Sequence, residues 1–323
     1  MIDLSLELSQ VKTVGITGHI RPDGDCVGST MGLYNYIFEN YPNVAVYVFL
    51  EECGDEFSYI PNIRRIRHEA DEDIKLDLCI VLDCSAIDRI EPFAAMFHGA
   101  KKTICIDHHV SNEAFAMVNE VVSDASSTCE VLYHLLKPEL ISKEVAECLY
   151  TGIIHDTGVF KYSCTSKETM AIAGELMEKG IDYSYIIDNS FYKKTYVQNQ
   201  ILGRALLESV LFFNGKCIFS VLRKKDLDFY GVCGRDLGGI IEQLRLTDGV
   251  EVAIFIYETG VHEYKVSMRS KNYIDVSKIC VLFGGGGHVR AAGCTMTGSP
   301  HDIINNLGAQ IELQFKKLGA EFD

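Results

Sequence analysis

Apolar runs of strand length alternate with helix-like segments through the first half of the chain. Short runs rich in β-branched residues predict strands at 11–17, 43–50, 77–84 and 101–109. Amphipathic segments predict helices between them, at about 26–40 and 87–98. Strands and helices that alternate in this way form mostly parallel sheets covered by helices on both faces. We therefore expect an α/β domain that binds ligands beyond the carboxyl ends of its strands.

The pattern changes twice further along the chain. Amphipathic segments predict helices at 126–136, 142–156 and 167–180, and a polar stretch with few helix breakers predicts a connecting helix at 192–209. Beyond it, the expected strands are 216–223, 250–258 and 263–270, and the expected helices lie near 234–246, 274–283 and 300–318. We expect two α/β domains, 1–190 and 200–323, joined by 190–200, with a mixed sheet in the smaller second domain. The active site would lie in the cleft between them, where small ligands commonly bind.

Composition narrows the class of protein. The 323 residues, 47% hydrophobic and 23% charged, suffice for two folded domains with separate cores. The twelve cysteines are scattered without a CxxC pair, and the first residues do not resemble a secretory signal, so we expect reduced thiols and a cytoplasmic location. Because no apolar run reaches the ~18 residues of a membrane span, we expect no membrane association.

The formal charge of −15 bears on the choice of ligand. Proteins that grip long nucleic acid neutralise many phosphates with Lys and Arg, so such a partner is not expected here. A small phosphorylated substrate held by metal ions remains compatible with this charge. Clustered carboxylates are also what divalent cations require.

The loop after the first predicted strand, GHIRPDGDCVGS, carries the candidate ligands His19, Asp23 and Asp25. Pro22 and Gly24 favour a turn that can direct the two aspartates to different positions of one site. Carboxylate oxygens suit manganese and magnesium, and an imidazole adds affinity for manganese or zinc. The alternative is that the aspartates only cap the following helix.

Three more ends of predicted elements repeat this chemistry. Asp83 follows the strand LCIVL, the triplet Asp107, His108 and His109 closes TICIDHH, and Asp156 ends GIIHD, next to His155, which we interpret as structural. Each aspartate could simply cap a helix. Together they supply enough donors for two ions that share one carboxylate, namely His19, Asp23, Asp25, Asp83, His108 and Asp156.

These motifs, in this order, resemble the DHH phosphoesterase superfamily. GHIRPDGDCVGS is similar to its first motif, VLDCS to its second, IDHH to its DHH signature and GIIHDTGVFKY to its fourth. FGGGGHVRAAG, at 283–293, is similar to the glycine-rich motif of the DHH-associated domain. The resemblance covers nearly the whole chain.

The resemblance implies two manganese ions, for which magnesium or cobalt could substitute. His19, Asp23 and Asp83 would hold one ion, and Asp25, Asp83, His108 and Asp156 the other. His109 would face the substrate phosphate, while Asp107 would orient the neighbouring histidines. Two such ions can activate a water and clamp a phosphoester for in-line attack.

The glycine-rich segment is the candidate substrate site. Gly285, Gly286 and Gly287 let backbone amides approach an anion, and His288 and Arg290 can bind a phosphate. Arg269, at a predicted strand end, is a further candidate. The alternatives are a flexible loop after a helix and an ordinary surface arginine.

The resemblance implies an enzyme that hydrolyses short oligoribonucleotides to mononucleotides, with adenosine 3′,5′-bisphosphate as a second substrate. A cyclic dinucleotide or its linear product is the alternative substrate, since the same motifs serve both. A nucleotide-binding regulator without catalysis would lack at least one metal ligand, and none is missing. A homodimer fits this branch of the family, although no stretch of the sequence indicates one.

Overall fold

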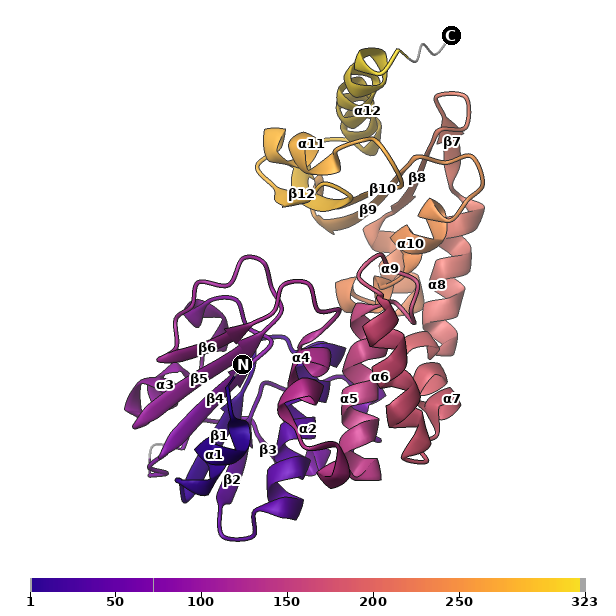
Figure 1. The fold of residues 1–323 in the computed structure, drawn as a ribbon. Coiled ribbons are helices and arrows are strands. Elements are labelled where there is room, and N and C mark those ends of the chain that lie inside the picture. Colours follow the sequence, from indigo (N-terminus) through magenta and orange to yellow (C-terminus); the bar gives the residue numbers. More distant parts are fainter. Residues whose placement is uncertain (1, 72, 320–323) are drawn as a thin grey trace. The chain divides into compact units, whose positions relative to one another are not determined.

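The structure, a computed structural model, describes residues 2–71 and 73–319. It divides into two compact units, with the boundary between Lys193 and Lys194 (Figure 1). Each unit has its own sheet and its own hydrophobic cores. In the described residues, no helix is both long and apolar enough to cross a membrane.

In the described part of the first unit, six strands form one parallel sheet in the order β3-β2-β1-β4-β5-β6. This confirms the predicted α/β fold class. The chain adds strands on one side of β1 and then, from β4 onward, on the other side, so the carboxyl ends of β1 and β4 form the topological switch point where such sheets bind ligands. The strands are β1 (Thr13–Thr17), β2 (Ala45–Phe49), β3 (Ile66–Arg67), β4 (Leu78–Leu82), β5 (Lys102–Asp107) and β6 (Val118–Val121).

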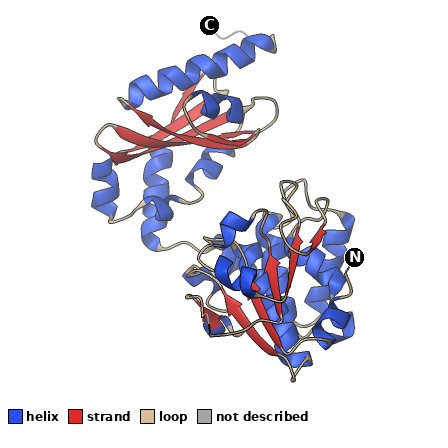
Figure 2. Cartoon of the chain, turned by 90° about the vertical axis from the view of Figure 1, so that its left-hand side faces the viewer, coloured by secondary structure: helices blue, strands red, loops and turns tan. Residues whose placement is uncertain are grey.

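Helices cover both faces of this sheet (Figure 2). In β4, Leu78, Ile80 and Leu82 pack into the core beneath α2, α4 and α5, whereas Cys79 and Val81 pack into the core beneath α3. This alternation follows from the two-residue period of a strand. The helices are α1 (Leu4–Ser9), α2 (Gly24–Asn40), α3 (Ala94–Gly99), α4 (Thr128–Leu135), α5 (Lys143–Asp156), α6 (Lys167–Glu178) and α7 (Tyr183–Ile186).

Helices α2 and α5 approach each other closely because glycines line their contact. A Cβ atom on Gly28 would lie 2.6 Å from the carbonyl oxygen of Cys148, and one on Gly152 would lie 2.6 Å from Oδ1 of Asp25. Real Cβ atoms are not found so close to other heavy atoms. The pair of helices therefore brings the beginning of α2 and the last turns of α5 together at the carboxyl edge of the sheet.

Among the described residues of the second unit, six strands form a mixed sheet in the order β11-β12-β10-β9-β8-β7. Only β8 and β9 pair in parallel, and the other pairs are antiparallel. This confirms the expected mixed α/β architecture. The strands are β7 (Val210–Phe212), β8 (Cys217–Leu222), β9 (Val252–Gly260), β10 (Glu263–Ser270), β11 (Gly286–His288) and β12 (Ala291–Thr297).

Helices cover this second sheet on both faces as well (Figure 2). In β9, Val252, Ile254 and Ile256 face the core with α11 and α12, while Ala253 and Phe255 face the core with α8 and α10. The helices are α8 (Tyr196–Leu207), α9 (Lys224–Tyr230), α10 (Ile240–Arg245), α11 (Val276–Leu282) and α12 (Pro300–Lys317).

Two predicted helices are wrong in extent. The segment 87–98 forms a 3₁₀ turn at Ile87–Ile90 and then α3, because Pro92 lies between them and cannot donate a backbone hydrogen bond. The segment 234–246 likewise forms a 3₁₀ turn and then α10, with Gly239 between them at φ +87°. The strands β3, β6, β7, β11 and β12 and the helices α1, α7 and α9 were not expected.

Replacing Gly152 by Ala should destabilise the first unit by about 1–3 kcal/mol, because the new methyl group would lie 2.2 Å from Sγ of Cys129 in α4 and 2.6 Å from Oδ1 of Asp25 in α2. Gly174 is the matched control, since it is exposed in α6 and a Cβ atom added there would have nothing within 4 Å. Gly174→Ala should be neutral or slightly stabilising. Urea unfolding followed by circular dichroism measures both, and equal midpoints for the two variants would contradict the close-packing argument.

Candidate active site

The ring of His19 is oriented by the backbone just beyond β1. Its Nδ1 donates a hydrogen bond to the carbonyl oxygen of Ile20 at 2.8 Å, so Nε2 is the atom left for a ligand. Nε2 lies 3.4 Å from Oδ2 of Asp83 and 3.7 Å from Oδ1 of Asp23. A backbone acceptor on the outer nitrogen is the arrangement that commonly orients metal-binding histidines.

Asp83 lies in the middle of the site, directly after β4. Its Oδ1 is 3.8 Å from Nε2 of His108 and accepts a hydrogen bond from Oγ1 of Thr128 at 3.1 Å. The residue is buried and adopts φ +55°, in the left-handed region that few non-glycine residues take and that aspartate takes more readily than most. One carboxylate therefore faces both His19 and His108.

A second group of candidate ligand atoms surrounds His108. Its Nδ1 donates to the carbonyl oxygen of Ala125, and its Nε2 lies 3.1 Å from Oδ2 of Asp156 at the end of α5. Nε2 is also 4.0 Å from Oδ2 of Asp25. The sequence placed these residues at the ends of separate elements, and the structure brings them side by side.

Asp23 and Asp25 each cap a helix as well as facing the histidines. Oδ1 of Asp23 accepts the N–H groups of Asp25 and Cys26 at the start of α2. Asp25 is fully buried, and its two oxygens accept the N–H groups of Thr128 and Cys129 at 2.6 and 3.0 Å, at the start of α4. Capping and metal binding are thus compatible at these positions.

The side chain of Asp107 points toward His109. Its Oδ1 accepts a hydrogen bond from Nδ1 of His109 at 2.7 Å, and its Oδ2 accepts one from Nδ2 of Asn112, also at 2.7 Å. Asp107 is fully buried, whereas the His109 side chain is 34% exposed. The hydrogen bond to Asp107 raises the pKa of His109 and leaves Nε2 as the outward-facing atom.

The electrostatics of the site favour a bound cation. Burial alone would lower the pKa of His19 and His108, but the neighbouring carboxylates outweigh it and raise each pKa to about 10. Burial and the neighbouring carboxylates raise the pKa of Asp25 and Asp156. Clustered carboxylates with inward imidazole nitrogens are a donor set that fits divalent metal ions.

His155, beside Asp156, packs in the first unit. Its ring contacts Phe57 and Phe191, and its Nε2 donates to Oγ of Ser190 at 3.1 Å. Burial lowers its pKa to about 4, so the ring is neutral. These contacts are those of a structural histidine.

In the second unit, the glycine-rich segment forms the short exposed strand β11, not a free loop. Gly286, Gly287 and His288 pair with β12, and Gly287 adopts φ +138°. A Cβ on Gly285 would lie 2.2 Å from the carbonyl oxygen of Gly293, so glycine is required there. The segment is therefore an ordered, exposed stretch of backbone.

The two candidate arginines make contacts within the second unit. Arg290 donates to the carbonyl oxygens of Ile274, at 2.8 Å, and Asn272. Arg269 donates through Nε to Oε1 of Glu242 at 2.9 Å. Both guanidinium groups thus hold parts of the fold, and their role in substrate binding stays a prediction.

Residues that the sequence interpretation missed support these side chains. Thr128 and Asn112 hold Asp83 and Asp107. In the second unit, the buried Glu251 accepts the N–H groups of residues 272–274, and Arg290 donates to the carbonyl oxygens of the first and last of these. For Thr128 and Asn112, the available sequence signals were the polar residues of the segments SST (126–128) and DHHVSN (107–112).

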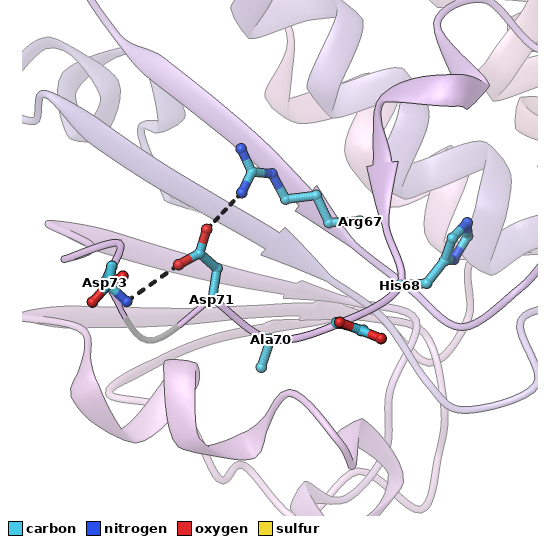
Figure 3. A pocket seen from close by; sticks show the side chains of 6 residues that line it. Arg67, His68, Ala70, Asp71 and Asp73 are labelled. Atoms are coloured by element: carbon cyan, nitrogen blue, oxygen red, sulfur yellow. Dashed lines mark hydrogen bonds and ion pairs between the residues drawn. The ribbon is translucent and has the colours of Figure 1, made fainter.

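None of the candidate metal ligands lines a surface hollow of about 620 Å³ in the first unit (Figure 3). In it, Arg67 forms an ion pair with Asp71 at 2.8 Å, and the same carboxylate accepts the N–H of Asp73. The lining residues are Arg67, His68, Glu69, Ala70, Asp71 and Asp73. Two of its charged lining residues, Arg67 and Asp71, are thus already paired with each other.

Replacing Asp107 by Asn should lower the pKa of His109, because the amide cannot stabilise the imidazolium as a carboxylate does. NMR titration of the metal-free protein measures this value directly. Asp71→Asn is the control. It removes an exposed carboxylate that pairs with Arg67, outside the DHH motif, and should leave the His109 pKa unchanged. An unchanged pKa in Asp107→Asn would refute the assigned hydrogen bond.

Solved structures and curated proteins resemble this chain along most of its length. The structure matches an exopolyphosphatase-related protein from Bacteroides fragilis with a TM-score of 0.86 at 24% identity, over 98% of this chain and 96% of that one. A Streptococcus mutans protein named probable bifunctional oligoribonuclease and PAP phosphatase NrnA is 28% identical, over 87% of this chain and 88% of its own. Its Bacillus subtilis counterpart, named bifunctional oligoribonuclease and PAP phosphatase NrnA, is 24% identical over 91% and 92%.

Two family models match successive parts of the chain. The model of the DHH family N-terminal domain matches residues 13–153, which include the first three motifs, and the DHHA1 domain model matches residues 214–317, which include the glycine-rich segment. The chain therefore belongs to the DHH family, as a phosphoester-hydrolysing enzyme with a DHH and a DHHA1 domain.

Proposed function

We propose that this enzyme hydrolyses oligoribonucleotides of a few residues to mononucleotides, and adenosine 3′,5′-bisphosphate to AMP, with two manganese ions. The observation that carries the proposal is Asp83, whose buried carboxylate faces His19 on one side and His108 on the other. The names of the relatives from S. mutans and B. subtilis support this choice of substrates.

The donor atoms divide into two sets around Asp83. His19 and Asp23 would hold one ion with it, and Asp25, His108 and Asp156 the other. When bound, such ions polarise phosphoryl oxygens and lower the pKa of a bound water toward neutrality. The hydrogen bonds to Ile20 and Ala125 hold both imidazoles with Nε2 directed inward.

His109 is placed to act on the substrate. Because Asp107 accepts from Nδ1 and raises the pKa of the ring, His109 can present a donor at Nε2 to a phosphoryl oxygen or to the leaving group. Asn112 holds the far oxygen of Asp107, so the carboxylate cannot turn away. A donor held in place before reaction stabilises negative charge as it develops.

A panel of substrates tests the proposal with the full chain and Mn²⁺. We expect turnover of a two-nucleotide RNA and of adenosine 3′,5′-bisphosphate to exceed that of a longer RNA and of a cyclic dinucleotide. Asp83→Asn should lower both rates about a thousandfold or more, since several kcal/mol of transition-state stabilisation depend on the metal site.

The matched control is Asp71→Asn, a surface carboxylate in the hollow of Figure 3, which should retain full activity. A clear preference for the cyclic dinucleotide would replace the proposed substrates with the alternative. Binding of the dinucleotide without turnover would favour a nucleotide-binding regulator.

Manganese binding should weaken as the pH falls. His19 and His108 have pKa values of about 10 in the metal-free protein, so near neutral pH each must lose a proton before Nε2 can bind an ion. The apparent affinity should fall about tenfold per pH unit for each proton released below that pKa. Calorimetry in two buffers with different ionisation enthalpies counts these protons, and a count of zero at pH 7 would contradict the raised pKa of the two histidines.

A further inference from the structure

The thiol of Cys26 lies in the first set of candidate metal donors. Its Sγ, one ring nitrogen of His19 and one carboxylate oxygen of Asp83 all lie within 4.8 Å of one another. All three side chains are buried. The thiol is therefore part of a three-residue cluster that already contains two proposed ligands.

The surrounding backbone holds this thiol in place. Cys26 belongs to the first turn of α2, and its Sγ lies 3.9 Å from the carbonyl oxygen of His19. A Cβ atom on Gly18 would lie only 2.3 Å from this sulfur, so the glycine leaves the space that the sulfur fills. Cys26 is fully buried, which limits the positions that its sulfur can take.

The remaining carboxylate of this set, that of Asp23, is more exposed than those of the other candidate ligands. The Asp23 side chain is 62% exposed, and its Oδ1 already accepts two backbone N–H groups. His19 and Asp83 alone give only two buried donors. The sulfur atom of Cys26 would supply a third buried donor beside them.

We propose that Cys26 binds the ion held by His19 and Asp83 through its sulfur. The inference rests on the proposed function, because it concerns the metal site of that function. On binding, the S–H bond breaks, a metal–sulfur bond forms and the proton passes to solvent. Soft thiolate ligands favour zinc, cobalt and iron over manganese, so Cys26 shifts the preference of this ion site toward those metals.

X-ray absorption of the full chain, stripped of metal and loaded with two equivalents of Zn²⁺, tests the proposal. We expect a sulfur scatterer at about 2.3 Å from zinc, the usual Zn–S distance. Cys26→Ser should lose this signal and should lower the affinity for Zn²⁺ relative to Mn²⁺ at least tenfold. Loading with Co²⁺ should give a sulfur-to-cobalt charge-transfer band only when Cys26 is present.

Cys84→Ser is the matched control. Cys84 is equally buried and directly follows Asp83, but its Sγ faces the carbonyl oxygen of Ala86 at 3.1 Å. It should keep the sulfur signal. If Cys26→Ser does not fold, as judged by circular dichroism, the wild-type spectrum still decides, together with Cys26→Ala.

Two failures can be told apart. Zinc bound without a sulfur scatterer would overturn the role of Cys26, while turnover of the two-nucleotide RNA by the same preparation would leave the proposed function intact. Failure of the wild-type chain to bind zinc or manganese would overturn both proposals.

Discussion

Asp25 is the residue on which the geometry of the site depends. A fully buried carboxylate without partners would cost several kcal/mol, and here the first N–H groups of α4 compensate for part of this cost. The partial positive charge at a helix N-terminus adds to the effect. Because Asp25 is itself in the first turn of α2 and lies against Gly152 of α5, this one side chain links three helices.

The same linkage creates a concentration of negative charge that the protein alone balances only in part. Asp25, Asp83 and Asp156 lie around His108, and burial with mutual repulsion raises the pKa of Asp25 and Asp156. The packing of α2 against α5 keeps Asp25 and Asp156, one on each helix, from separating. The site thus remains able to bind a cation because the glycine contacts do not allow its acidic groups to relax outward.

The sequence located the carboxylates and histidines but not the groups that hold them. His19, Asp83 and His108 were predictable because each follows a parallel strand, and the carboxyl ends of such strands meet at one edge. Thr128 and Asn112 act through contacts that depend on how a loop folds back on the sheet. The partner of Arg269, Glu242, lies 27 residues away in the sequence, a pairing that local pattern does not reveal.

Gly24, in the first motif, meets two physical requirements at once. Gly24 was expected to permit a turn between Asp23 and Asp25. In the structure it also lies against His155, since a Cβ at this position would be 2.1 Å from the ring. The neutral ring of His155 thus packs against the backbone between the two aspartates, while Asp156, the next residue, faces His108. The end of α5 therefore contributes to the site in two ways: Asp156 is a proposed metal ligand, and His155 supports the turn that carries Asp23 and Asp25, two more proposed ligands.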